Sequence, residues 1–292
     1  MKYRVTHTSH YAYGSPVDLA AHVLHLRPRP LPWQTIISER MVTDPARARR
    51  RDGVDHFGNV VTWLFLDLPH ADFTVTAESL VEVAYPPPPA ATSTIPWEAL
   101  VDAAGEAGAG SAAEYRFDSP MAAANAAARD YARRSFAAGR PVLEALLDLN
   151  TRIYQEFRFR AGVTTLSTPV SQVMKNREGV CQDFSHVMIS ALRGLGVPAR
   201  YHSGYIRTRP PPGQIRRQGA DQSHAWVGAW LGPEHGWIDL DPTNGIVVHD
   251  EHVLIGWGRD YSDVSPVRGV ILGGGAHRMT VSVDLEPDGE GS

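Results

Sequence analysis

The chain has 292 residues, 43% of them hydrophobic and 21% charged, with a formal net charge of −4 and a pI of about 6.3. This composition is typical of a globular protein, and without a basic surface we expect no binding to nucleic acid or membranes. No stretch is apolar enough to span a bilayer or to resemble a signal peptide, so we expect a cytoplasmic location. The single cysteine excludes an internal disulfide.

The first part of the chain, residues 1–90, is predicted to form an antiparallel β domain, either a sandwich or a barrel. Apolar and polar residues alternate over 3–7, 73–77 and 81–85, as they do in strands with one buried face. Residues 60–66 form a short apolar run that is rich in β-branched and aromatic side chains. Several short strands separated by turn signals are typical of all-β folds.

Four prolines at 86–89 end the β region, because proline cannot continue a hydrogen-bonded ladder. The following segment, 91–118, is rich in Pro, Ala and Gly and is predicted to be a linker. Residues 119–285 are then expected to form the second, core domain, with a strand at its C-terminal end, and 286–292 a tail.

Helical and strand patterns both occur in the core domain, which predicts an α+β fold with helices packed on an antiparallel sheet. Ser119 as N-cap and Pro120 at the first helical position indicate a helix start. The predicted helices cover 119–134, 141–157, 168–179 and 181–193. The predicted strands cover 199–207, 224–231, 237–240 and 279–285, with a loop over 208–222.

Cys181 lies at the start of a predicted helix, directly after Gly179 and Val180. The amide groups and the dipole of a helix N-terminus favour a thiolate, and the same amides could bind an oxyanion. A lone cysteine is, however, commonly a small buried apolar residue. Position alone therefore leaves both a catalytic and a packing role open for Cys181.

His224 and Asp241 are the candidates for a base and its orienting carboxylate. His224 begins one predicted strand, and Asp241 ends the next, after a turn at 232–236. With a short turn, Trp226 and Asp239 are expected to lie roughly opposite each other, which brings Asp241 beside His224. We expect Asp239 to point to the other face of the strand, which makes it the weaker candidate.

Other residues near these three are candidates for binding substrate or for supporting the site. An acidic Asp183 in the first helical turn is explained by the helix dipole alone, and His186 is expected to point away from Cys181 and to serve in packing. Arg259 and Asp260 are expected to form an ion pair that holds the C-terminal segment. The candidates are Gln182, Asp183, Tyr205, Ser223, Trp226 and Tyr261.

Five segments in this order, 179–186, 195–205, 223–227, 237–244 and 258–266, resemble the core of the bacterial transglutaminase-like superfamily. The first 85 residues resemble the N-terminal β domain of that family. The resemblance implies a papain-like Cys–His–Asp triad, which falls on Cys181, His224 and Asp241. We expect no cofactor.

The sequence departs from the animal transglutaminases next to the nucleophile. Those enzymes have a tryptophan there, whereas this chain has Gln182, so the second oxyanion donor stays unassigned. The calcium-binding segments of the animal enzymes are also not recognisable in the sequence.

Three functions are compatible with the sequence. The first is a cysteine-dependent acyl-transfer enzyme that acts on a peptide or isopeptide amide through a Cys181 thioester, resolved by water or by an amine, with a slight preference for hydrolysis. The second is a non-catalytic peptide-binding module on the same fold. The third is a metal site; it is disfavoured because no two-histidine helical motif or paired cysteine occurs. Its candidate ligands would be Cys181, His224, His235, Asp241, His249 and His252.

Overall fold

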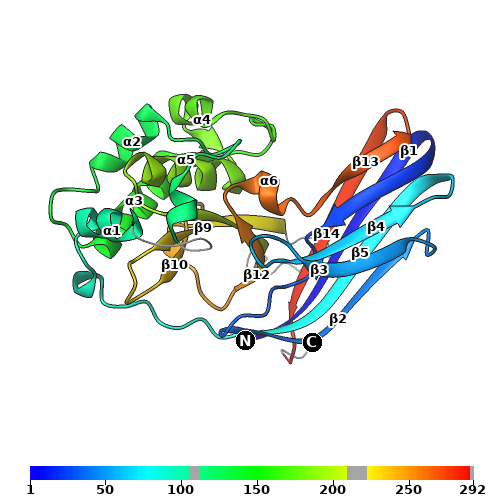
Figure 1. Ribbon diagram of the computed structural model, residues 1–292, viewed down its shortest axis with the longest axis horizontal. Helices are drawn as coiled ribbons and strands as arrows, with labels where there is room; N and C mark the ends of the chain where they lie inside the picture. The colour runs from blue at the N-terminus through cyan, green and yellow to red at the C-terminus, as the bar shows by residue number, and fades with distance from the viewer. Residues whose placement is uncertain (106–111, 209–221, 290–292) are drawn as a thin grey trace, which may run out of the picture.

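The computed structural model describes residues 1–105, 112–208 and 222–289. Two parts are evident in Figure 1: a long curled antiparallel sheet, and a smaller sheet that is covered by helices. The α+β class predicted from the sequence is therefore confirmed. The chain begins in the curled sheet, builds the helical part, and returns through α6 to the curled sheet.

The curled sheet is organised around one very long strand, β1 (Lys2–Leu24). The first half of β1 pairs with β5 and β14 and the second half with β4 and β13, with a register shift in the β1–β5 pairing between Ala12 and Val17. The result is one seven-stranded sheet rather than a sandwich or a closed barrel. Its other strands are β2 (Gln34–Asp44), β3 (Arg49–Val54), β4 (Val60–Leu66), β5 (His70–Val83), β13 (Val267–Gly273) and β14 (His277–Pro287).

The C-terminal strand lies in a different sheet from the one expected. The sequence analysis placed 279–285 in the core domain, but β14 pairs with β1 along its whole length, with Val5 opposite Leu285. Val283 and Leu285 are buried there against Tyr3 and Val81. The alternation of apolar residues correctly predicted a strand, but alternation does not specify which partner a strand pairs with.

The helical part is built on a five-stranded antiparallel sheet in the order β11-β10-β9-β8-β12. The predicted strands 199–207, 224–231 and 237–240 are confirmed as β8 (Ala199–Ile206), β9 (Gln222–Trp230) and β10 (Trp237–Asp241). The short β11 (Ile246–Val247) and β12 (His252–Gly258) complete the sheet. The predicted loop at 208–222 lies almost wholly outside the described residues.

The helices are α1 (Trp97–Gly105), α2 (Ala126–Arg133), α3 (Val142–Glu156), α4 (Val170–Asn176), α5 (Cys181–Gly194) and α6 (Tyr261–Val264). Three predicted helices agree with α3, α4 and α5, whereas α2 begins later than expected. Its N-cap is Asn125, whose side chain accepts a hydrogen bond from the Ala128 amide. Ser119 instead accepts a hydrogen bond from the buried Arg193.

The segment 91–118 is not a simple linker. It contains α1 and the short 3₁₀ helices Ala91–Ser93 and Ala112–Arg116. Leu100 and Ala104 of α1 are fully buried in the same core as α3 and α5. A low-complexity composition hid these contacts, because alanine packs well without giving a strong apolar pattern. None of the described helices is long and apolar enough to cross a membrane.

Gly204 in β8 allows the site side of the small sheet to pack closely. A Cβ atom there would lie 2.1 Å from the Val253 carbonyl oxygen and 2.6 Å from the Trp226 ring. We therefore expect Gly204→Ala to lower the free energy of unfolding by about 3 kcal/mol or more. Gly236→Ala is the control, because its Cβ meets nothing within 4 Å and its positive φ costs only about 1 kcal/mol. Chemical denaturation would contradict this account if both variants lost the same stability.

Candidate active site

The structure brings Cys181, His224 and Asp241 together. Cys181 is the first residue of α5 and is half-buried, His224 lies in β9, and Asp241 is the fully buried last residue of β10. His224 Nε2 lies 2.8 Å from Asp241 Oδ2. This leaves Nδ1 of the ring free, and Cys181 contributes to the raised pKa of His224. The imidazole is therefore held by the carboxylate and lines the same cleft as the sulfur.

The strand register differs from the expected one by two residues. Leu240 pairs with Val227 and Asp239 with Gly228, so Trp226 lies level with Asp241 and not with Asp239. The prediction that Asp239 points to the opposite face was also wrong. Residues two apart in a strand share a face, so Asp239 points to the same face as Asp241. Its carboxylate lies 3.4 Å from Trp226 Nε1.

The Asp241 carboxylate is held by more groups than His224. Oδ2 also accepts hydrogen bonds from His252 Nε2 at 3.3 Å and from Asn244 Nδ2 at 2.6 Å. Oδ1 accepts hydrogen bonds from the Thr243 and Asn244 amides. Burial by itself would raise the pKa of Asp241, but the hydrogen bonds from both histidines outweigh it and hold the pKa far below its usual range.

Asn244 was not predicted as a site residue, and His252 was considered only as a ligand of the disfavoured metal site. Asn244 follows Asp241 closely in a turn, and Asx side chains commonly accept or donate local hydrogen bonds in turns, so that signal was present in the sequence. His252 comes from the start of β12 on the far side of β8, and only the folding of the sheet brings it to Asp241. Both are positioning residues in this arrangement, because they contact the carboxylate and not the thiol.

Burial lowers the pKa of His224, but hydrogen bonds and charge from Asp241 and Cys181 outweigh burial and raise the pKa to about 10. The imidazolium form is therefore favoured at neutral pH, and a proton is available on the ring beside the sulfur. This is the protonation state required of a group that protonates a leaving amine.

The raised pKa of His224 has a consequence for stability. The folded state binds this proton more tightly than the unfolded chain, so the stabilisation is complete below pH 6.5 and is lost as the pH rises to about 10. We expect the wild type to lose on the order of 3 kcal/mol relative to His224→Gln over that range. Urea denaturation of both proteins from pH 6 to 10 measures the difference, and a constant difference would refute the linkage.

The triad opens into a cleft of about 550 Å³ between the two parts of the molecule. Cys181, Gln182, Ser223 and Tyr261 line the cleft on the side of the helical part. The opposite wall comes from β1 and β14 and is mainly apolar. Its residues include His7, Ser9, Tyr11, Met279, Val281 and Val283. The curled sheet therefore forms part of the site, which the sequence did not indicate.

Three of the other candidates do not line this cleft. Asp183 is buried and accepts hydrogen bonds from the Val180 amide and the Thr164 hydroxyl, which caps the start of α5. Tyr205 is buried, and its hydroxyl lies 2.9 Å from His7 Nδ1. Trp226 is fully buried behind the triad, with its ring stacked at 6.2 Å from the ring of His224. These three side chains are buried beneath the cleft and do not contribute to its lining.

His186 lies away from the sulfur in a packed environment. It is buried, its ring contacts that of Tyr201 at 5.1 Å, and its Nε2 accepts a hydrogen bond from the Tyr261 amide. Burial lowers its pKa to about 4, so the ring is neutral and able to accept that bond. Through it, α5 fixes the position of Tyr261 at the edge of the cleft.

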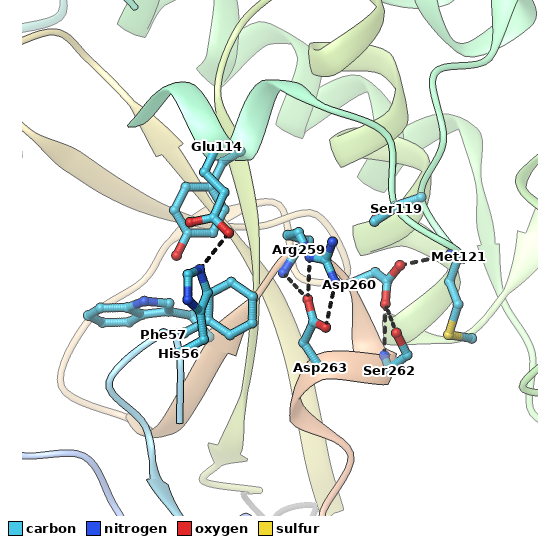
Figure 2. A network of polar contacts seen from close by, with 12 residues as sticks. His56, Phe57, Glu114, Ser119, Met121, Arg259, Asp260, Ser262 and Asp263 are labelled. Carbon is cyan, nitrogen blue, oxygen red and sulfur yellow. Dashed lines mark hydrogen bonds and ion pairs between the residues drawn. The ribbon is translucent and has the colours of Figure 1, made fainter. Parts of the chain in front are cut away.

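The expected Arg259–Asp260 ion pair is not formed. Figure 2 shows that Arg259 pairs instead with Asp263, one helical turn later, through Nε at 2.9 Å and Nη2 at 3.0 Å. Asp260 accepts hydrogen bonds from the amides of Met121 and Ser262. Asp260 thus caps α6 and ties it to the segment before α2. Adjacent residues point in different directions at a helix start, so proximity in sequence was misleading.

The histidines considered for a metal site are only partly brought together. Ligand atoms of His224, Asp241 and His252 lie within 4.8 Å of one another. These residue types would suit a divalent cation. In the structure the same atoms form the hydrogen bonds that orient the triad, and His235 and Cys181 do not belong to the group.

Comparisons with known proteins identify the family of this chain. The bacterial transglutaminase-like N-terminal region matches residues 3–82, and the transglutaminase-like superfamily core matches residues 129–242. An uncharacterized protein of Mycobacterium tuberculosis is 41% identical over 98% of this chain and 93% of its own length. The chain therefore belongs to the transglutaminase-like superfamily.

Two further similarities concern a solved structure and a named enzyme. A crystal structure of a candidate cysteine protease from Cytophaga hutchinsonii matches all of this chain and 92% of its own, with a TM-score of 0.75 and 20% identity, which shows the shared fold. A protein-glutamine gamma-glutamyltransferase of Pseudomonas aeruginosa is 30% identical over 122 residues, which covers 39% of this chain and 17% of that protein.

Proposed function

We propose that the protein is a thiol acyl-transfer enzyme that acts on a peptide or isopeptide amide. The observation that carries the proposal is the buried imidazole of His224, which hydrogen-bonds Asp241 on one nitrogen and lines the same cleft as the Cys181 thiol, whose influence raises its pKa. Nucleophile, base and orienting group thus stand in the order required for covalent catalysis.

In the proposed reaction the Cys181 thiolate attacks the amide carbonyl carbon and forms a tetrahedral oxyanion. The Cys181 amide at the start of α5 is a donor for this oxyanion. The carbon–nitrogen bond then breaks, and His224 transfers its proton to the departing amine or ammonia. A thioester of Cys181 remains. Water or a second amine attacks it, His224 takes up the proton of the nucleophile, and the thiolate is released.

The cleft supports an acyl donor with apolar groups. Its far wall includes the half-buried Tyr11 and the β14 side chains Met279 and Val281, which are about half exposed and not covered by other described residues. Exposed apolar side chains beside a catalytic cleft commonly contact substrate. A peptide segment with aliphatic or aromatic residues would therefore gain more from this wall than a charged one.

Water and amine acceptors share the first covalent step, so one assay has to follow both outcomes. A library of glutamine-containing and isopeptide-linked peptides, with and without a primary amine such as dansylcadaverine, would be scored for ammonia release, cleavage and amine incorporation. Hydrolysis predicts cleavage or ammonia release that is independent of the amine. Transamidation predicts dansyl incorporation. The similarity to a gamma-glutamyltransferase supports including the amine arm.

The alternative is a non-catalytic module that binds peptides in the same cleft. Mass spectrometry of acid-quenched reactions separates the two, because an acyl-enzyme adds the mass of the acyl group to the peptide that contains Cys181. Since Cys181 is the only cysteine, no other thiol can carry the adduct. The absence of both adduct and product, with peptide binding retained, would favour the module. Treatment with EDTA tests in parallel the expectation that no metal takes part.

A further inference from the structure

A second pocket of about 360 Å³ lies between β10 and the proline segment 86–89. Its described lining residues include Trp33, Tyr85, Arg200 and Trp237, together with the acidic residues Glu234 and Asp239. It shares none of these with the catalytic cleft. The pocket thus lies apart from the triad and has a lining of its own.

Arg200 is the unusual group in this pocket. Its side chain lies between two tryptophan rings, with the guanidinium carbon 4.2 Å from the centre of Trp237 and 3.8 Å from that of Trp257, and only 5% of the residue is exposed. Nε donates a hydrogen bond to His202 Nε2 at 2.8 Å. Among the described residues, Nη1 and Nη2 have no hydrogen-bonding partner, and no carboxylate lies within 4 Å of them.

The nearby carboxylate of Asp239 is engaged by other donors. Asp239 Oδ2 lies 3.2 Å from His202 Nδ1, 3.4 Å from Trp226 Nε1 and 3.4 Å from the Tyr85 hydroxyl. His202 Nε2 accepts the hydrogen bond from Arg200 Nε, and Nδ1 of the same ring lies on the side of Asp239. Asp239 lines the same pocket as Arg200 and acts on its charge, but the two side chains form no ion pair within 4 Å.

A buried cation without a direct counter-ion is costly, and proteins usually pair such groups. Burial lowers the pKa of Arg200 to about 10, and the charge of Asp239 opposes this effect, so the guanidinium remains protonated at neutral pH. The tryptophan rings shield its two faces by cation–π contact but satisfy no N–H group. Nη1 and Nη2 of Arg200 therefore lack a negatively charged hydrogen-bond acceptor in the described part of the chain.

We propose that this pocket binds a carboxylate that is attached to an apolar or aromatic body. The free nitrogens of a guanidinium present a planar fork that matches the two oxygens of a carboxylate. Trp33, Tyr85, Trp237 and the prolines supply the apolar walls. The volume suits a ligand of the size of an acylated amino acid or the end of a peptide. The carboxylate comes either from such a small acid or from the C-terminus of a peptide.

The test compares N-acetyl-L-phenylalanine with its uncharged amide, by calorimetry on protein whose Cys181 is alkylated. Alkylation blocks the catalytic cleft, so failure of the proposed reaction and failure of this site are distinguished. We expect the acid to bind at least about tenfold more tightly than the amide. The indole N–H resonances of Trp33 and Trp237 are expected to shift with the acid. That of Trp63, in the curled sheet, is the internal control.

Arg200→Lys keeps the charge but removes the fork, and it is expected to weaken binding of the acid at least about tenfold while leaving the amide unaffected. If this variant does not fold, the comparison of acid with amide on the wild type still decides. Equal affinity for the two probes, no binding of either, or indole shifts at Trp63 alone would overturn the proposal. The peptide Gly-Gly-Phe, measured against its C-terminal amide, distinguishes the two sources of the carboxylate. If Gly-Gly-Phe binds more tightly than N-acetyl-L-phenylalanine, the natural ligand is a peptide C-terminus. If Gly-Gly-Phe binds more weakly, the natural ligand is a small acid.

Discussion

Replacing His224 by alanine is expected to slow alkylation of Cys181 by iodoacetamide by about 100-fold at pH 7, because a positioned base commonly contributes 10²–10⁴ to such a rate. The imidazole lines the same cleft as the sulfur, its pKa is raised by Cys181 as well as by Asp241, and it is held in place by Asp241 at 2.8 Å. Without it the thiol loses the group that accepts its proton and stabilises the thiolate. Mass spectrometry of the intact protein over time gives the rate without ambiguity, since the chain has one cysteine.

His56→Ala is the matched control for this experiment. His56 is exposed in the curled part of the molecule, where its ring pairs with Glu114 at 2.8 Å, as Figure 2 shows. We expect the alkylation rate of this variant to equal that of the wild type. Equal rates for the wild type and His224→Ala would mean that the imidazole does not activate Cys181, and the proposed enzyme would then have no base.

Asp241→Asn is expected to reduce the rate of Cys181 acylation by p-nitrophenyl acetate by roughly 10³- to 10⁴-fold, the size of effect known when the carboxylate of a triad becomes an amide. The amide would keep the shape of the side chain but remove the charge that raises the pKa of His224. It would also offer N–H groups to His224, His252 and Asn244, all of which now approach Oδ2. The ring of His224 would then rotate or take the other tautomer.

Asp55→Asn provides a comparison in the same protein, because Asp55 also contacts a buried histidine, His25, at 3.3 Å. That contact lies outside the catalytic cleft and should leave the acylation rate unchanged. The burst of p-nitrophenolate, followed by stopped-flow absorbance, measures acylation separately from turnover. If Asp241→Asn acylated as fast as Asp55→Asn, the carboxylate would have a structural role only. Circular dichroism is required for both variants to confirm folding.

Local signals in the sequence were sufficient to predict most of the helices and strands in the helical part of the molecule. The helices α3, α4 and α5 agree with their predictions, because apolar residues at helical spacing are bounded by proline or glycine at the ends. The strands β9 and β10 and the turn between them agree for a similar reason. These elements carry Cys181, His224 and Asp241, so the sequence alone predicts that the three residues lie together.

Other features depended on contacts between distant segments. The strand β2 was missed because most of its side chains are exposed and it carries no clear alternation. The register of β9 and β10 was misjudged by two residues, since a turn of five residues allows more than one pairing. Asp239 points to the same face as Asp241, because side chains two residues apart in a strand lie on one face.

The sequence by itself determined the family, the α+β class, and which cysteine, histidine and aspartate stand at the ends of which elements, because these follow from local pattern and motif order. Only the tertiary structure decided that β14 returns to pair with β1 and forms the second wall of the cleft. It also decided that His252 holds Asp241 from across the sheet, and that Arg200 lies between two tryptophans without a counter-ion. Such contacts join residues far apart in the chain, and their energies depend on packing and burial that no local pattern encodes.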